Sequence, residues 1–269
     1  MTATTDHAKR DLMLNALRLP TMRQLARSLG EQSDREGWPA IRTLAARATH
    51  ERADREQRRR ARNLAAAKLL PGKTLSSFDF SAIPAISKAQ ITARAAGDAW
   101  ISQGSSCIAI GPPGVGKSHL ASAIGQELIE NGYRVLMCRT PDLVQKLQTA
   151  RRELELERML ASLDTFPLLI LDDFSYLSKD EAETTVLFEL IAVRVERRSL
   201  MITANQPFSA WDRLFPDETT AVAAVDRLVH KAVILEMNAE STRRKETLQR
   251  QRKAGRPAQY ATAKNTTTD

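Results

Sequence analysis

The stretch Gly111-Pro112-Pro113-Gly114-Val115-Gly116-Lys117-Ser118 decides the fold. It fits the pattern G-x-x-x-x-G-K-[ST] and stands between an apolar, strand-like run and a helix-like segment. Glycines allow successive backbone N–H groups to turn toward phosphate oxygens, and the following helix adds the positive end of its dipole. The alternative is a glycine- and proline-rich turn that binds nothing, and the strand-to-helix setting argues against it. The stretch therefore predicts a phosphate-binding loop.

The side chains of the loop indicate its ligands, ATP and Mg²⁺. We expect Lys117 to reach the β- and γ-phosphates and the hydroxyl of Ser118 to bind Mg²⁺. His119, the last residue of the predicted nucleotide-binding set, belongs to the following helix and is expected to have no chemical role of its own. The predicted nucleotide-binding residues are Gly111, Pro112, Pro113, Gly114, Val115, Gly116, Lys117, Ser118 and His119.

Two acids end a second apolar run. Leu168-Leu169-Ile170-Leu171 leads into Asp172 and Asp173, as expected where a buried strand emerges at the C-terminal edge of a sheet. Ligands of open α/β sheets bind at that edge. A strand that ends in an acidic turn is common, but here a phosphate-binding loop accompanies it. We therefore predict Asp172 as a direct or water-mediated Mg²⁺ partner and Asp173 as the base that orients the attacking water.

A third apolar run, Leu200-Met201-Ile202-Thr203, is followed by Ala204 and Asn205. An isolated Asn after a strand is more often a turn residue. Asn205, however, lies 33 residues after Asp172 with one helix-like segment between them. This spacing favours a role in holding the water or the γ-phosphate.

Strands and helices alternate from Ser106 onward, which is typical of a parallel sheet covered on both faces. The strand-like runs are short and apolar without alternation, as expected for strands buried on both faces. We therefore expect an α/β P-loop fold with a five-stranded parallel sheet. The expected strands are 107–110, 134–138, 168–171, 200–203 and 233–236, and the expected helices are 118–131, 141–163, 181–197 and 219–231.

The first part of the chain reads as helices and predicts a small all-helical N-terminal domain, residues 1–73. Apolar residues recur at helical spacing on both sides of Pro20 until Gly30, and a turn-like stretch, 31–37, precedes a long helix over 39–70. Its second half is rich in arginine. Phe78 and Phe80 are expected to anchor the connector that follows.

The net charge of +8 is unevenly distributed. Residues 1–73 hold 16 Lys and Arg against 8 Asp and Glu, residues 74–237 hold 16 against 21, and residues 238–269 hold 8 against 3. Two basic ends around an acidic middle suit a protein that binds a polyanion, although charge runs are also found on solvated helix faces. The DNA-contact candidates in the long helix are Arg58, Arg59 and Arg60.

The composition bounds the class of protein. A chain of 269 residues with 42% hydrophobic residues can build a sizeable core without disulfides. Cys107 and Cys138 lie in apolar runs, so we expect reduced core cysteines rather than a disulfide or a metal site. No run approaches the roughly 18 apolar residues of a membrane span, and the first residues do not resemble a signal peptide. A cytoplasmic protein without membrane association is expected.

The order of the phosphate loop, Asp172-Asp173, Asn205 and Asp226-Arg227-Leu228 resembles that of AAA+ ATPases of the initiator and helicase-loader branch. Over about residues 10–245 the chain more closely resembles the IstB-like family, the ATP-binding helper proteins of insertion-sequence transposition. The runs that carry this resemblance are Gly111 to Ala121, Leu169-Ile170-Leu171-Asp172-Asp173-Phe174, Glu196-Arg197-Arg198-Ser199, Thr203-Ala204-Asn205-Gln206-Pro207-Phe208 with Trp211, and Asp226-Arg227-Leu228-Val229-His230.

The resemblance implies roles for further residues. Asn205 matches the sensor position, and Arg227 matches the arginine finger that one subunit of a homo-oligomer inserts into its neighbour's ATP site; the alternative for Arg227 is a surface salt bridge. With Lys117 and Asp173 these residues form the predicted catalytic set. The helical insertion 141–163 matches the element that initiator-type ATPases use on DNA. It makes Lys146, Arg151 and Arg152 candidates for DNA contact, with a solvated face as the alternative.

The chain departs from the AAA+ pattern in two respects. Only about 30 residues follow the last expected strand, so no C-terminal lid domain is expected, and Arg243 stands where the family tends to carry a Ser-x-Arg. Asp173 stands where many relatives carry Glu, which predicts slow hydrolysis. The expected division is 1–73 for DNA or partner binding, 74–245 for the AAA+ ATPase domain, and 246–269 for a basic, disordered tail.

The expected function is that of a Mg²⁺-dependent, slow ATPase of the bacterial cytoplasm, associated with DNA and stimulated by DNA or a partner. It would assemble on double-stranded target DNA and recruit or activate its cognate transposase. The alternative is a DnaC-like loader of a replicative helicase, which would bind single-stranded DNA. A third class, an NTP-binding module without DNA affinity, would show no salt-sensitive DNA binding.

Overall fold

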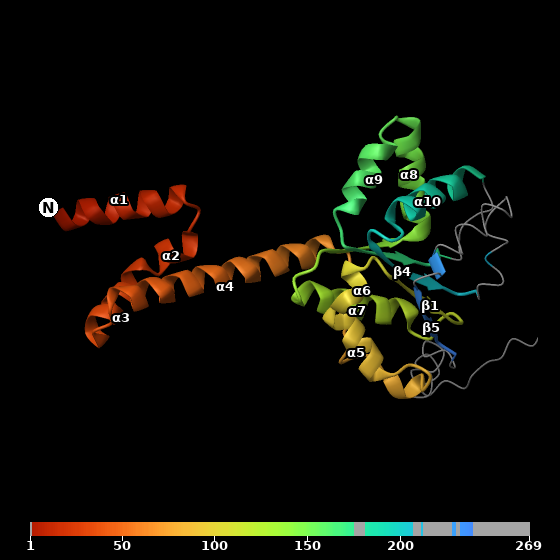
Figure 1. The fold of residues 1–269 in the computed structure, drawn as a ribbon, viewed down its shortest axis with the longest axis horizontal. Helices are drawn as coiled ribbons and strands as arrows, with labels where there is room; N and C mark the ends of the chain where they lie inside the picture. The colour runs from red at the N-terminus through yellow and green to blue at the C-terminus, as the bar shows by residue number, and fades with distance from the viewer. Residues whose placement is uncertain (1, 175–180, 207–210, 212–227, 230–231, 239–269) are drawn as a thin grey trace, which may run out of the picture. The chain divides into compact units, whose positions relative to one another are not determined.

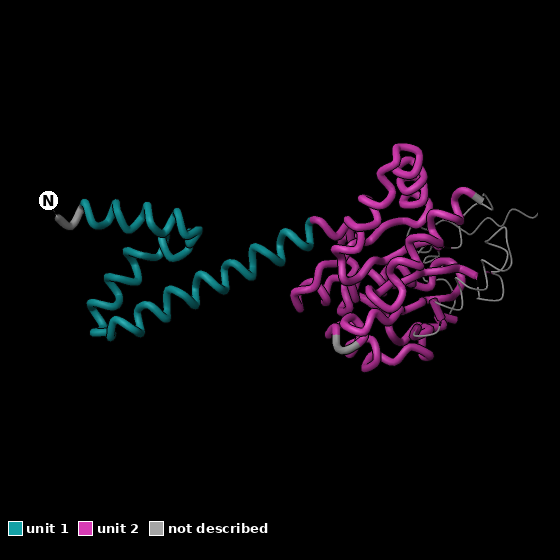
Figure 2. Tube along the Cα trace, turned by 45° about the horizontal axis from the view of Figure 1, so that its top comes forward, with its two compact units in different colours: residues 1–65 teal, residues 66–269 magenta. Residues whose placement is uncertain are grey.

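The computed structural model describes residues 2–174, 181–206, 211, 228–229 and 232–238 of the chain. Contacts divide the chain into two compact units, Met1–Ala65 and Ala66–Asp269 (Figure 2). Among the described residues no helix has both the length and the apolar character needed to cross a membrane.

The second unit contains a five-stranded parallel sheet (Figure 1). The strand order is β2-β3-β4-β1-β5, and every neighbouring pair is parallel. The predicted α/β fold with its five parallel strands is thereby confirmed. The strands are β1 (Ser106–Ile110), β2 (Val135–Arg139), β3 (Leu168–Asp172), β4 (Ser199–Ala204) and β5 (Ala232–Glu236).

Helices cover both faces of the sheet, and each face has its own apolar core. Ile108 and Ile110 of β1 belong to the core beneath α8, α9 and α10, whereas Cys107 and Ala109 belong to the core beneath α5, α6 and α7. This alternation follows from the two-residue period of a strand, and burial on both faces explains why the strands read as continuous apolar runs. The helices are α5 (Lys88–Ala96), α6 (Asp98–Ser102), α7 (Lys117–Glu130), α8 (Thr140–Arg152), α9 (Leu156–Asp164) and α10 (Glu181–Arg194).

The single helix expected over 141–163 is wrong, because the structure has two helices there, α8 and α9. The break falls at Leu154, which has a φ of 59° and a side chain that is 94% exposed. The reversal brings Leu160 and Leu163 of α9 back onto the core shared with α8, which an unbroken helix would not allow. The helix expected over 219–231 lies outside the described residues except for residues 228 and 229.

The first unit consists of α1 (Thr2–Ala16), α2 (Pro20–Gln24), α3 (Ala26–Glu36) and most of α4 (Ala40–Ala66). The expected stop at Gly30 and turn over 31–37 are wrong. Gly30 lies inside α3, where an added Cβ would meet the Arg47 guanidinium at 3.4 Å, and the helix ends instead at Gly37 with φ 64°. Since glycine adopts this left-handed conformation without strain, Gly37 is the better helix end.

Glu51 of α4 ties the first unit together. Its side chain is 4% exposed, and Oε2 accepts hydrogen bonds from the backbone N–H groups of Thr21 and Met22 at 2.8 and 2.9 Å. These N–H groups belong to the first turn of α2, whose own cap residue makes no side-chain cap. The carboxylate therefore supplies from another helix the cap that α2 lacks.

Candidate nucleotide-binding site

The phosphate-binding loop begins where β1 ends and runs into α7. At Gly111 an added Cβ would lie 2.3 Å from the carbonyl oxygen of Met237, so the chain passes too close to residue 237 for any side chain. Gly114 and Gly116 have φ values of 87° and 103°, which only glycine adopts readily. The three glycines of the motif thus match what the backbone of this turn requires.

Lys117 is 6% exposed, so its ammonium group is largely removed from water. Nζ donates hydrogen bonds to the carbonyl oxygens of Gly111 and Pro112 at 2.7 and 2.8 Å. A desolvated ammonium group interacts strongly with any anion that approaches it. The cation is therefore held over the loop itself, where it suits the phosphates of a nucleotide.

Asp172, the last residue of β3, is 7% exposed. Its Oδ1 accepts a hydrogen bond from Thr203 Oγ1 of β4, and its backbone carbonyl accepts one from Thr140 Oγ1 at 2.8 Å. Thr203 also accepts a hydrogen bond from the backbone N–H of Asp173 at 3.1 Å. One buried hydroxyl therefore fixes both acids, and the sequence had indicated Thr203 only as the end of an apolar run.

Asp173 differs from Asp172 in exposure and in backbone conformation. It has a φ of 59° and a side chain that is 33% exposed. Its carboxylate Oδ2 lies 3.7 Å from Nε of Arg139, the last residue of β2. Aspartate tolerates the left-handed region better than most residues, so the turn points this carboxylate away from the strand at moderate cost.

The strand order brings the predicted site residues to one edge of the sheet. Because β3, β4 and β1 are adjacent and parallel, their C-terminal ends place Asp172, Asn205 and Gly111 side by side. Ser118 follows in the first turn of α7 and, like Asn205, is partly exposed. Hydroxyl and carboxylate oxygens are the ligands that Mg²⁺ prefers, so Ser118 and Asp172 fit this ion. The roles of these residues stay predictions.

A connector, residues 67–80, is bonded along α7 next to the loop. Ser122 Oγ donates to the carbonyl of Leu70 and accepts from its N–H at 2.9 Å. The ring of Phe78 lies 3.1 Å from where a Cβ on Gly116 would be, and an edge contact joins it to His119. The expected anchoring by Phe78 and Phe80, which pack edge to face at 4.8 Å, is confirmed.

His119 also belongs to this connection. Its Nε2 lies 3.0 Å from the carbonyl oxygen of Thr74 and 3.1 Å from Ser77 Oγ. Burial lowers the pKa of the imidazole, and the hydrogen bond to the Thr74 carbonyl opposes that shift. The geometry gives His119 a part in fixing the connector.

The candidate DNA contacts of α4 differ in what already binds them. Arg58 lies 2.9 Å from Asp54 and 3.6 Å from the buried Glu51, and it donates to Thr21 Oγ1. Arg60 lies 3.8 Å from Glu56. Arg59 is exposed and has no ion-pair partner within the described part of the chain. Arg58 is thus largely committed to the fold of its own unit, whereas Arg59 presents its charge to solvent.

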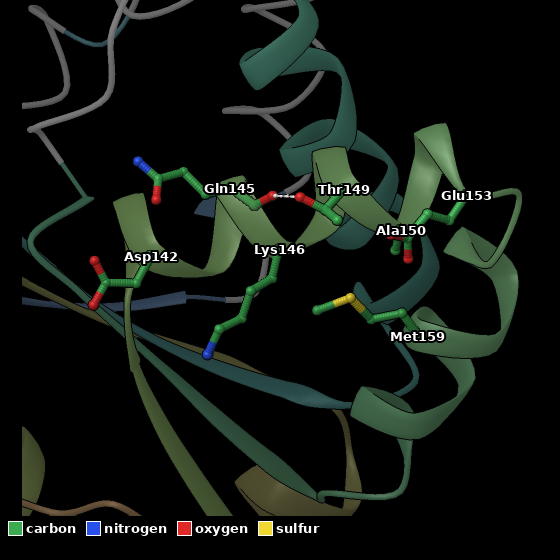
Figure 3. A pocket seen from close by; sticks show the side chains of 7 residues that line it. All are labelled: Asp142, Gln145, Lys146, Thr149, Ala150, Glu153 and Met159. Carbon is green, nitrogen blue, oxygen red and sulfur yellow. Dashed lines mark hydrogen bonds between the residues drawn. The ribbon is translucent and has the colours of Figure 1, made fainter.

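The candidates on α8 lie around an open pocket of about 720 Å³ between α8 and α9. Figure 3 shows Lys146 and Met159 reaching into this pocket from the two helices. Arg151 pairs with Glu189 of α10 at 3.1 Å, and Arg152 donates to Thr149 of its own helix at 3.3 Å. Of the three, Lys146 is the cation directed into a concave surface.

The arginine-finger candidate, Arg227, and Arg243 lie outside the described residues, as does the segment where a lid would follow.

Two aromatic residues from the runs that carry the family resemblance, Phe174 and Trp211, are fully buried. Their ring centroids lie 4.7 Å apart. They contribute to the core beneath α10.

Two solved structures share this fold. Two structures of the replication initiator DnaA match, one from Aquifex aeolicus with bound AMPPCP and one with AMPPCP and single-stranded DNA. Their TM-scores are 0.51 and 0.52 at 20% identity, and each match covers 71% of this chain and 58% of the other. The matches show the fold, and fold and loop together define an α/β P-loop protein.

The sequence relatives define the family. The family model of the IstB-like ATP binding protein matches residues 12–250, and the chain belongs to this family. An insertion-sequence ATP-binding protein of Sinorhizobium fredii is 61% identical over 262 residues, which cover 97% of this chain and 88% of that protein. The ATP-binding protein of insertion sequence IS21 from Pseudomonas aeruginosa is 35% identical over 245 residues, 91% of each chain. The resemblance drawn from the motifs is confirmed.

Proposed function

We propose that this protein is an ATP-dependent, DNA-binding helper of transposition. In its ATP state it assembles on duplex target DNA and recruits or activates its transposase, and hydrolysis of ATP dismantles the assembly. The observation that carries the proposal is the set of phosphate loop, Asp172-Asp173 and Asn205 at one sheet edge, in a chain whose relatives are named as insertion-sequence ATP-binding proteins. The surplus of basic residues at both ends of the chain supports DNA as a partner.

The residues divide the work of hydrolysis between them. The loop N–H groups and Lys117 bind and orient the β- and γ-phosphates, while Asp173 accepts a proton from the attacking water and Asn205 holds that water or the γ-phosphate. Mg²⁺ held by Ser118 and Asp172 would neutralise charge on the phosphates. Thr203 keeps both acids in place through the two hydrogen bonds that it makes.

We propose that each subunit of the assembly supplies a residue to the active site of its neighbour. Arg227 of one subunit would stabilise the charge of the transition state in its neighbour, so a monomer would be nearly inactive. Such fingers contribute about 10³-fold or more to the rate of hydrolysis. We expect Arg227→Ala to abolish turnover in a phosphate-release assay while ATP affinity is kept. Normal turnover by this variant would refute the interface.

The test of the proposed function is fluorescence anisotropy of labelled duplex and single-stranded DNA, with and without a slowly hydrolysed ATP analogue at moderate salt. Analogue-dependent binding that prefers long duplex is the expected result. A preference for single strands would instead support a loader of a replicative helicase. Absence of binding to either DNA would leave an ATP-binding protein without a nucleic-acid partner.

A further inference from the structure

A cluster of exposed arginines lies at the N-terminal edge of the sheet, at the opposite end of the strands from the nucleotide site. Arg134 directly precedes β2, and Arg197 and Arg198 directly precede β4. The length of β4 places this edge roughly 17 Å from the end of the strand that leads to Asn205. We call Arg134, Arg197 and Arg198 the arginine edge. A ligand bound there would not meet the phosphate loop.

A single carboxylate pairs with the arginines that precede β4. Asp164 is 17% exposed and lies 3.3 Å from Arg197 and 3.9 Å from Arg198. The same carboxylate lies 3.9 Å from the fully buried Arg194. Burial lowers the pKa of the Arg194 guanidinium to about 10; the charge of Asp164 opposes this shift, and the charge of Arg198 adds to it. Because one carboxylate neutralises only one of these guanidinium groups, the cluster keeps a surplus of positive charge.

The buried and the exposed arginines of this cluster differ in what binds them. The guanidinium of Arg194 donates to the carbonyl oxygens of Leu163 and Ser199 at 2.8 and 3.2 Å, so it belongs to the core of the fold. Arg197 and Arg198 are 66% and 43% exposed. Within the described part of the chain, their side chains have no ion-pair partner other than the shared carboxylate. These two guanidinium groups are therefore accessible to a partner.

Arg134 extends the cluster along the edge. The strands β2, β3 and β4 begin in register, so Arg134 and Arg198 precede strand ends that are two strand spacings, or about 10 Å, apart. The guanidinium carbon of Arg134 lies 4.6 Å from the ring centroid of Phe166, and Nη1 donates to the carbonyl oxygen of Thr165 at 3.4 Å. Arginine and aromatic residues are enriched among the residues that dominate protein interfaces. The edge thus has the composition of a protein-binding surface.

We propose that the arginine edge docks a short acidic segment of the partner transposase, whose Asp and Glu side chains pair with Arg134, Arg197 and Arg198. A planar guanidinium binds a carboxylate through two parallel hydrogen bonds. A span of about 10 Å corresponds to residues three apart in an extended peptide. Duplex DNA presents a row of phosphates that continues past such a span, so the compact cluster suits a peptide better. The inference rests on the proposed function, because it names the surface that meets the recruited partner.

The first experiment measures the affinity of purified transposase for the full chain, with duplex DNA and a slowly hydrolysed ATP analogue present. The double variant Arg197→Gln/Arg198→Gln should bind about four- to 25-fold more weakly, which is about two- to five-fold for each guanidinium. The matched control is Arg27→Gln/Arg158→Gln, which removes the same charge at arginines that are 90% and 84% exposed. Equal affinities of the two double variants overturn the inference.

A competitor tests the acidic chemistry of the docked segment. Poly-L-glutamate should displace the transposase from the wild type, and it should have a weaker effect on the binding that Arg197→Gln/Arg198→Gln retains. If the competitor left the binding of the wild type unchanged, the docked segment would not be acidic and the inference would be overturned.

The second experiment applies duplex anisotropy, ATP-analogue binding and size-exclusion chromatography to Arg197→Gln/Arg198→Gln. All three should match the wild type, because the edge lies at the far end of the strands from the nucleotide site. A loss of duplex affinity as large as the loss for the transposase would assign the edge to DNA. A loss of assembly would assign it to a contact between copies of this chain, and either result overturns the inference. A wild-type chain that binds no transposase refutes the proposed function itself.

Discussion

The phosphate loop and the basic helix α4 both carry positive charge, but the two regions hold it differently. Lys117 is nearly buried, and backbone carbonyls of its own loop bind its ammonium group. Arg58, Arg59 and Arg60 of α4 lie at the surface, where acids of the same helix pair with Arg58 and Arg60 while Arg59 stays exposed. The position of a cation that is bound by the backbone of its own loop can be predicted from a short motif. The role of a surface cation depends on which side chains lie next to it in the folded protein, and a motif does not predict these.

The largest effect is expected at the buried cation. Lys117→Ala should reduce ATP turnover by at least about 100-fold, because it removes a preorganised charge from a largely desolvated site. Phosphate release and binding of a fluorescent ATP analogue measure the loss. Lys88→Ala, at an exposed lysine that begins α5, is the control. If Lys117→Ala kept its turnover within a few-fold of the wild type, the buried ammonium group would not be needed for hydrolysis.

Glu51 is a buried charged residue of the helical unit, so it tests whether burial matters there as it does for Lys117 in the phosphate loop. Glu51→Gln should lower the free energy of unfolding by about 2 kcal/mol, because a neutral amide is a poorer acceptor for the two N–H groups of α2. Urea denaturation followed by circular dichroism measures this. The matched control is Glu56→Gln on the same helix, whose half-exposed carboxylate pairs with Arg60 at 3.8 Å. Equal losses in both variants would contradict the role given to burial.

Thr203 tests whether the nucleotide-binding site also depends on a side chain that holds its two acids in place. Thr203→Val keeps the shape but removes the hydroxyl that donates to Asp172 and accepts from the N–H of Asp173. We expect about a tenfold lower turnover number with little change in ATP affinity, because the loop is untouched. Steady-state kinetics over a range of Mg²⁺ concentrations measures the change. An unchanged turnover number would mean that the turn alone positions both acids.

The smallest effects separate two neighbouring arginines of α4. Arg58→Ala should cost the first unit up to about 1 kcal/mol of stability, because Arg58 pairs with Asp54 and Glu51. Arg59→Ala should leave stability unchanged and reduce the salt dependence of DNA binding by about one contact. Urea denaturation and anisotropy titrations at several salt concentrations check both. A reversed pattern would mean that the pairs seen in α4 do not decide which arginine meets DNA.

The sequence predicted the sheet well because β1, β3 and β4 are buried along their whole length, and β2 and β5 are also apolar runs. Such strands are continuous apolar runs with sharp ends, so all five were located to within one or two residues. The predicted helix over 141–163 missed the break at Leu154, because no glycine or proline marks a turn that exists to return Leu160 to the core. Likewise Gly30 looked like a helix end, although it lies inside α3, which continues to Glu36.

The residues of the candidate site divide in the same way into those that the sequence predicts and those that it does not. The loop, Asp172 and Asp173 follow from motifs whose residue types the geometry demands. Thr203 and Arg139 could not be found in this way, because each is a common residue at a strand end and acts only through register with a neighbouring strand. Pairing between distant strands is set by the whole sheet, and a single sequence does not show it.

The connector has a practical consequence for exchanging modules between related proteins. Residues 67–80 are fixed to α7 by Ser122, His119 and the Phe78 ring over Gly116, although in the sequence they follow directly from the long helix. A chimaera joined after residue 73 would separate the backbone of Leu70 from Ser122, with which it shares two hydrogen bonds. A functional graft of the helical unit onto another member of the family should therefore be joined before Ala67, so that the phosphate loop and the connector are inherited together.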